Sequence, residues 1–241
     1  MSQSETAVPF SVQRKQEYTE KKNKIIQEKR EQFENRVAEN AKYAQETTEK
    51  LLNFYYSHEK AIEKKKAELE AKNMIYVPSE PEFLVVMKLR SSLRAPPKQR
   101  KILELLRLKR MNSLVFVKNN KSTRRMLQLA KDYVSFGTIS YELLRELIYK
   151  RAVCRINNIN TKLSNETIDL AFGGEIRCIE EIVHSIYFGT SLFKDANNFL
   201  CPIALHAPIG GFKGRKSKSF MEGGCMGNHH DLIGEIISKM I

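Results

Sequence analysis

The 241-residue sequence has no tryptophan, no glycine before Gly137 and no proline between Pro9 and Pro78. Its longest uninterrupted apolar run is the five-residue stretch Phe83–Met87, whereas a helix that spans a membrane needs about 20 apolar residues. The polar N-terminus also lacks the apolar core of a secretory signal. We therefore expect neither a membrane protein nor a secreted one.

Cysteine is scarce, and no two of the four cysteines form a C-x-x-C pair. They are too widely spaced for a zinc ribbon, and Cys225 with the adjacent pair His229–His230 does not complete a tetrahedral site. The chain also lacks a G-x-S-x-G elbow, a P-loop and a credible pair of catalytic carboxylates. The sequence thus predicts an intracellular protein with no metal, no cofactor, no small-molecule substrate and no catalytic activity. The four cysteines are Cys154, Cys178, Cys201 and Cys225.

Positive charge is in excess, and it is confined to one segment. Residues 88–131 carry 14 basic side chains and one acidic side chain, Glu104, so that their net charge of +13 equals that of the whole chain. A block of one sign repels itself unless a polyanion neutralises it, and nucleic acid is the commonest cellular polyanion. Two alternatives are a solvated basic face that serves solubility and an acidic membrane surface. The second fits less well, because no single basic amphipathic helix is present.

The first third of the chain is rich in Glu, Lys, Gln and Ala, which are good helix formers. Residues 1–76 are predicted to form a helical extension of one or two long helices. Their apolar residues recur only about once per heptad, which is too narrow a stripe for a stable two-stranded coiled coil. The extension is therefore expected either to fray in solvent or to lie on a surface that something else supplies, and a self-associating scaffold is the remaining alternative.

Beyond Pro78 and Pro81, strand and helix patterns alternate. This alternation predicts an α+β fold in which helices cover a small sheet. Antiparallel hairpin-like steps and split β-α-β units are both compatible with the short connections, and we favour the split units. The expected elements lie at residues 83–90, 96–110, 114–118, 122–134, 136–139 and 141–151.

The last third is less regular. Apolar stripes predict helices at residues 164–172 and 178–188, and a closing helix at 228–240. Between them lies a Pro-, Gly- and Lys-rich stretch at 202–227.

Within that stretch, glycine alternates with basic residues. Glycine lets a backbone approach a phosphate ribbon, and Phe212 or Phe220 is placed to stack on an exposed base. A loop with no ligand is the alternative. The candidate RNA-binding residues of this loop are Gly210, Gly211, Lys213, Arg215, Lys216 and Lys218.

A phosphate-binding surface is predicted around residues 90–101. Five cations surround the start of the helix expected there, where free N–H groups and the helix dipole already favour an anion. Two further basic clusters extend this surface into one continuous strip if they lie on the same side, with contacts to phosphate and sugar that position RNA without reading bases. The candidate residues of the strip are Lys88, Arg90, Arg94, Lys98, Arg100, Lys101, Arg107, Lys109, Arg110, Lys118, Lys121, Arg124 and Arg125.

Several runs of the chain together resemble one family. They are YVPSEPEF, RKILELLRLKRMNSLVFVKNNKSTRRML, ELIYKR, the stretch from Cys178 through HSIYFGTSLFKDANNFL, and the loop from GGFKG to EGGCMGN. In this order, over about residues 76–241, they are similar to eukaryotic large-subunit ribosomal protein seven, a relative of bacterial large-subunit ribosomal protein thirty. Agreement over so many segments is more specific than any single motif.

The resemblance implies a ferredoxin-like RNA-binding core at residues 77–160, preceded by the helical extension at 1–76 and followed by a C-terminal part at 161–241 with helices and an rRNA-contacting loop. It implies a structural, non-catalytic protein of the cytosolic large ribosomal subunit that binds large-subunit rRNA, supports subunit assembly and passes through the nucleolus. Neighbouring ribosomal proteins are the implied partners of the N-terminal helix. A ribosome-biogenesis paralogue acting on nucleolar precursors is the alternative. The family's RNA contacts fall on Arg90, Arg94, Lys98, Arg100, Lys101, Lys109 and Arg110.

Three departures from the family pattern bear on RNA binding. Residues 1–76 carry 15 basic and 13 acidic side chains, whereas the family's extension is usually strongly basic. Cys201 stands where the family usually has Trp, and Ile209 where it usually has a basic residue. We therefore expect weaker rRNA contact by the extension and near Gly210.

Overall fold

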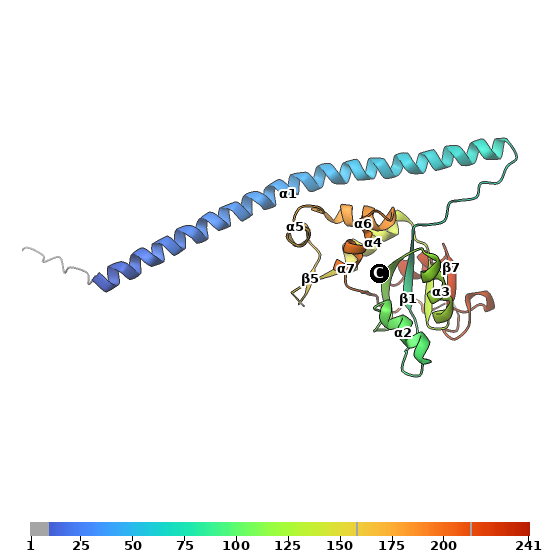
Figure 1. The fold of residues 1–241 in the computed structure, drawn as a ribbon. Coiled ribbons are helices and arrows are strands. Elements are labelled where there is room, and N and C mark those ends of the chain that lie inside the picture. Colours follow the sequence, from blue (N-terminus) through green and yellow to red (C-terminus); the bar gives the residue numbers. More distant parts are fainter. Residues whose placement is uncertain (1–9, 158, 213) are drawn as a thin grey trace, which may run out of the picture.

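The computed structural model describes residues 10–157, 159–212 and 214–241. Its most extended element is α1, a single helix of 62 residues, Phe10–Ala71, which at 1.5 Å per residue is about 93 Å long. Figure 1 shows α1 lying along the body of the protein and projecting beyond it. The helical extension expected from the sequence is therefore one continuous helix.

The centre of the body is a five-stranded sheet with the order β6-β2-β1-β3-β7. Both neighbours of β1 run antiparallel to it, so that β2 and β3 are parallel to each other with β1 between them. The helix α3 connects β2 to β3, and this arrangement is the predicted split β-α-β unit. The strands are β1 (Phe83–Lys88), β2 (Ser113–Lys118), β3 (Val134–Gly137), β6 (Ile203–Ala204) and β7 (Gly227–His230).

Helices cover the two faces of this sheet, because alternate strand residues point to opposite sides. Val86 and Val115 pack with Leu127 under α2 and α3, whereas Val85 and Phe116 belong to the larger core under the later helices. That larger core combines residues from 77–160 and 161–241. The α+β fold class is thereby confirmed. The helices of the body are α2 (Pro97–Leu105), α3 (Lys121–Ala130), α4 (Tyr141–Arg151), α5 (Asn165–Phe172), α6 (Ile179–Tyr187), α7 (Phe193–Phe199), α8 (Ile233–Ser238) and the 3-10 turn η1 (Phe220–Glu222).

The C-terminal part differs from the sequence prediction at its end. Residues 228–230, expected in a closing helix, belong to β7, which pairs in parallel with β3, and only Ile233–Ser238 form α8. The apolar spacing there is genuine, but pairing with β3 satisfies the backbone groups of the first residues instead. Neither α7 nor the hairpin of β4 (Val153–Ile156) and β5 (Ile159–Lys162) was predicted. Within the described part of the chain, no helix combines the length and the apolar character that crossing a membrane requires.

Candidate nucleic-acid interface

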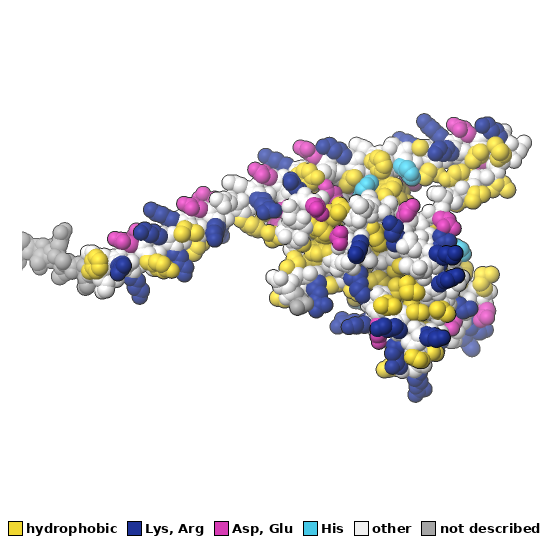
Figure 2. All heavy atoms as spheres, viewed as in Figure 1, with side chains coloured by type: hydrophobic (Ala, Val, Ile, Leu, Met, Phe, Trp, Pro, Cys, Tyr) yellow, Lys and Arg dark blue, Asp and Glu magenta, His cyan; other side chains and the backbone are white. Residues whose placement is uncertain are grey.

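The first basic surface surrounds α2, and we call it the α2 patch. Pro97 begins the helix, and the Arg100 guanidinium donates a hydrogen bond to the Leu93 carbonyl at 2.9 Å, so that the preceding loop is fixed against the helix. In Figure 2 dark blue side chains gather at the lower tip of the body, where Figure 1 places α2. Every member of the patch is exposed: Arg90, Arg94, Lys98, Arg100, Lys101, Lys109 and Arg110.

Lys88 does not belong to this surface, which corrects the sequence prediction. Its side chain is 1% exposed, and its Nζ donates hydrogen bonds to Ser92 Oγ at 3.1 Å and to the carbonyls of Leu108 at 3.0 Å and Lys109 at 2.9 Å. Burial lowers the pKa of Lys88. The ammonium thereby connects Ser92, which precedes α2, with Leu108 and Lys109, which follow it. Lys88 therefore positions the α2 patch without being part of its surface.

Arg107 is also used within the protein. It follows α2 with a positive φ of 60°, and its guanidinium donates hydrogen bonds to the carbonyls of Asn197 at 2.8 Å and Leu200 at 3.1 Å. Burial lowers the pKa of Arg107. This side chain fastens the end of α2 to the end of α7, and little of it is left for a ligand.

The second basic surface, the α3 patch, consists of Lys118, Lys121, Arg124 and Arg125, all exposed. Lys118 pairs with Phe83 at the start of β1, whereas the α2 patch follows the end of that strand. The two patches therefore lie at opposite ends of the strands, and the expectation of one continuous strip is wrong. Arg124 is also paired with Glu80 and donates to Asn119, and this ion pair lowers the pKa of the Glu80 carboxyl.

The glycine-rich loop lies apart from α2 in the sequence and holds its own basic residues. Gly210, Gly211, Arg215, Lys216 and Lys218 are exposed, whereas Lys213 lies outside the described residues. The two aromatic candidates for base stacking already have partners. The Lys216 ammonium lies 4.5 Å from the centre of the Phe212 ring, and the Phe220 and His229 rings are 4.3 Å apart.

The middle of α1 is docked on the body. The Arg36 guanidinium binds Asp169 of α5 at 2.7 Å, and the Tyr43 hydroxyl donates to Glu181 of α6 at 2.8 Å, a hydrogen bond that raises the pKa of Tyr43 to about 12. Farther along, the Tyr55 ring stacks on Tyr141 of α4 at 4.2 Å. The N-terminal part of α1 carries apolar side chains that remain exposed, among them Tyr18, Ile25 and Phe33.

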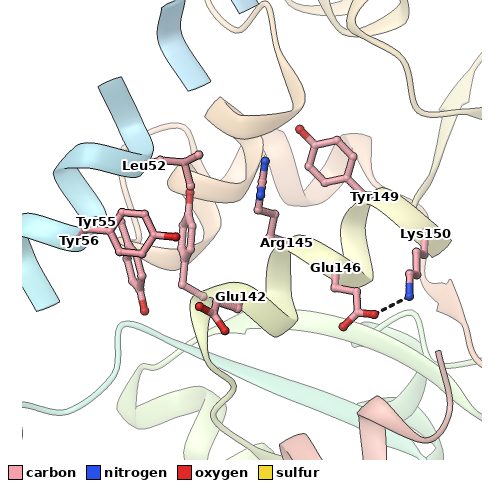
Figure 3. A pocket seen from close by; sticks show the side chains of 9 residues that line it. Leu52, Tyr55, Tyr56, Glu142, Arg145, Glu146, Tyr149 and Lys150 are labelled. Carbon is pink, nitrogen blue, oxygen red and sulfur yellow. Dashed lines mark hydrogen bonds and ion pairs between the residues drawn. The ribbon is translucent and has the colours of Figure 1, made fainter. Parts of the chain in front are cut away.

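A pocket of about 490 Å³ lies at the seam of α1 and α4. Figure 3 shows Leu52, Tyr55 and Tyr56 of α1 on one side and the side chains of α4 on the other. Lys150 of α4 pairs with Glu146 of the same helix at 2.5 Å, and Arg145 of α4 pairs with the buried Glu180 of α6 at 2.5 Å. The second pair fastens α4 to α6.

Among residues 10–157, 159–212 and 214–241, no three His, Cys, Asp or Glu side chains lie close enough together to hold a metal ion. Of the two histidines near Cys225, His229 is 2% exposed and engages the Cys225 carbonyl at 3.0 Å. What the surface offers a ligand is therefore mainly clustered positive charge.

Comparison with known proteins places the chain among ribosomal proteins of one family. A family model described as ribosomal protein L30p/L7e matches residues 84–134, the segment that contains both basic patches. The chain is 52% identical over 233 residues to large ribosomal subunit protein uL30 of Encephalitozoon cuniculi, which covers 97% of each chain. It is 37% identical to uL30B of Schizosaccharomyces pombe, with 92% of each chain covered, and 35% identical to uL30 of Drosophila melanogaster, with 80% of this chain and 77% of the relative covered.

Proposed function

The chain belongs to the ribosomal protein L30p/L7e family, whose members are structural and non-enzymatic, and we propose that it anchors itself in the large ribosomal subunit by binding rRNA through the α2 patch. The observation that supports this proposal is that the seven cations of the α2 patch are all exposed around one short helix. Residues 88–131, which contain them, have a single acidic side chain, Glu104. Lys101 lies 4.0 Å from that carboxylate, a distance at which an exposed pair gains little.

Phosphate neutralisation supplies the binding free energy. Each Lys or Arg that replaces a condensed counterion releases it to bulk solvent, so that affinity falls steeply with added salt. Arg94 and Lys98 are the strongest candidates, because neither has a side-chain partner among the described residues and both lie beside the N-terminus of α2, whose free N–H groups also favour phosphate. The α3 patch, through Lys118, Lys121 and Arg125, and the exposed cations of the glycine-rich loop add further phosphate contacts.

The long helix α1 has a different role. Its charges are mixed in sign, so it attracts RNA far less than the α2 patch does, while its exposed apolar residues Tyr18, Ile25 and Phe33 need a partner surface. We assign the projecting N-terminal part of α1 to contacts with neighbouring ribosomal proteins. We further propose that the protein joins the large subunit during assembly in the nucleolus and reaches the cytosol as part of the mature subunit.

Charge reversal tests the anchor. The double variant Arg94→Glu, Lys98→Glu is expected to reduce incorporation into large subunits at least tenfold, because it replaces two attractions to phosphate by two repulsions. The matched control Lys64→Glu, Lys65→Glu makes the same change in charge on α1 and is expected to incorporate normally. Incorporation is measured by sucrose-gradient sedimentation of tagged protein before and after a high-salt wash.

The same gradients separate the remaining alternatives. Salt-resistant protein in large subunits, monosomes and polysomes is the expected distribution of a structural constituent. Confinement to nuclear precursor particles would identify an assembly factor instead, and equal incorporation of the two double variants would remove the α2 patch as the anchor.

A further inference from the structure

We infer that a second rRNA-binding groove lies beside the α2 patch, between the last turn of α4 and the β4–β5 hairpin, and that it holds a stretch of RNA backbone. The groove has a volume of about 740 Å³ and is lined from four separate parts of the chain, by Arg110, by Lys150 and Arg151, by Asn160 to Lys162, and by Cys201, Pro202 and Ala204. This inference rests on the proposed function and extends it to residues outside the predicted basic segment.

The charge of the lining has one sign. Its ionisable side chains are Arg110, Lys150, Arg151 and Lys162 besides Tyr149 and Cys201, and no Asp or Glu belongs to the part of the lining that the structure describes. Lys150 and Arg151 also occupy the last turn of α4, where they offset the negative end of the helix dipole. The groove therefore attracts an anion, although the helix end by itself would repel one.

Two of these four cations are already partly engaged, and two are open. Lys150 pairs with Glu146 at 2.5 Å, and the Arg151 guanidinium donates to the backbone carbonyl of Ile241. Arg110 and Lys162 are exposed and have no side-chain partner in the described part of the chain. The open pair would therefore bind phosphate, while the engaged pair holds the wall of the groove in place.

The uncharged residues of the lining favour a nucleotide chain over an acidic peptide as the occupant of the groove. The Cys201 Sγ–H donates to the side-chain Oδ1 of Asn160 at 3.7 Å, which leaves the side-chain N–H₂ group of Asn160 available to sugar or phosphate oxygens. Pro202 and Ala204 add a small apolar surface against which a ribose or base can lie. Phosphate, ribose and base are thus each matched by a group of the lining.

Continuity with the α2 patch identifies the occupant. Arg110 belongs to both surfaces, and Arg107, through its hydrogen bonds to the Asn197 and Leu200 carbonyls, fixes the end of α2 to the chain just before Cys201. The two surfaces are therefore held rigidly side by side. An RNA strand that leaves the α2 patch at Arg110 enters the groove and reaches Lys162.

The test is equilibrium binding of the full-length chain to transcribed large-subunit rRNA over a salt series. Lys162→Ala is expected to weaken binding about fivefold and to lower the slope of log K against log salt by about 0.7 to 0.9, the change for one lost phosphate contact. Lys64→Ala, which removes the same charge from an exposed site on α1, is expected to leave both quantities unchanged. Because Lys162 is exposed at the end of β5, its removal does not threaten the fold.

The outcomes separate this inference from the proposed function. If Lys162→Ala binds like the unmodified chain while Arg94→Glu, Lys98→Glu binds weakly, the groove inference is wrong and the α2 anchor stands. If all variants bind alike, both fail. If Lys162→Ala binds rRNA normally but releases another protein from purified large subunits, the occupant is an acidic protein segment, and the RNA assignment is overturned.

Discussion

The middle of α1 and its N-terminal part belong to one continuous helix but have different surroundings. From Arg36 to Tyr55, the helix contacts α4, α5 and α6 through ion pairs, hydrogen bonds and stacked rings. Toward its N-terminus the helix projects beyond the body (Figure 1), and its apolar residues Tyr18, Ile25 and Phe33 are exposed. The difference shows that the helix is held where the body supplies complementary ion-pair, hydrogen-bond and aromatic partners, and that the projecting part still lacks such a surface.

Two tyrosines test this comparison with the largest expected effect. Tyr55 is 8% exposed and stacks on Tyr141, whereas Tyr18 is 69% exposed. We expect Tyr55→Ala to lower the free energy of unfolding by about 3 kcal/mol, since it removes a buried aromatic ring, and Tyr18→Ala to leave it unchanged within about 0.5 kcal/mol. Urea unfolding followed by circular dichroism measures both. Equal losses in the two variants would show that the projecting part contributes to stability in the isolated protein.

The basic segment also contains one buried and one exposed residue of the same type, both of them lysines. Lys88 is buried and donates three hydrogen bonds, whereas Lys98 is exposed on the α2 patch. Lys88→Met keeps the length of the side chain but leaves two buried carbonyls without their donor, and is expected to cost about 2 kcal/mol of stability. Lys98→Met is expected to leave stability unchanged and to weaken rRNA binding.

Thermal unfolding and rRNA binding, measured on the same two variants, separate these roles. Because Lys88 is buried, we expect it to act on RNA only by positioning the α2 patch. The slope of the salt dependence of rRNA binding is therefore expected to stay the same in Lys88→Met and to decrease by about 0.7 to 0.9 in Lys98→Met. A lower slope in Lys88→Met would return Lys88 to the group of direct phosphate contacts.

Much of the fold was predictable because local patterns and tertiary structure agree. The helix Tyr141–Arg151 matches its predicted bounds, and the split β-α-β unit follows from the alternation of strand and helix patterns. β7 was not predictable, since its residues pair with β3 more than 90 positions earlier in the chain, and a one-dimensional pattern contains no information on that pairing. The strand displaced the first turn of the predicted closing helix for this reason.

The candidate site divides in a similar way. Charge counting finds the segment that we propose binds rRNA. It does not distinguish Lys88 and Arg107, whose charges are used inside the protein, from Arg94 and Lys98, which are exposed. It also misses the groove, because Lys150, Arg151 and Lys162 lie in a part of the sequence whose charges are balanced overall. Only the packing of the β4–β5 hairpin beside α4 brings these cations together.

The smallest predicted effect sharpens the comparison within α1 by means of pH. His184 of α6 lies under the docked part, with its ring 5.7 Å from Phe54 and 4.7 Å from Phe188. Burial lowers the pKa of His184 and outweighs the opposite effect of the nearby Glu181 carboxylate. A histidine whose pKa is lower in the folded state than in the unfolded state binds a proton more weakly when the protein is folded, so protonation favours unfolding. Its contribution to stability is therefore complete above the unfolded pKa of about 6.5 and is lost as the pH falls through the folded pKa.

Hydrogen exchange at about pH 7.5 and about pH 5.5, corrected for intrinsic rates, is expected to show reduced protection of the docked part of α1 at the lower pH. The His184→Gln variant separates this contribution from that of His229, whose pKa burial also lowers but which lies in β7, away from α1. Glutamine does not titrate, so the protection of the docked part should lose most of its pH dependence in the variant. The projecting part, which has no contact with His184, should exchange alike in both proteins. If the pH dependence of the docked part survives in His184→Gln, another group causes it and His184 does not.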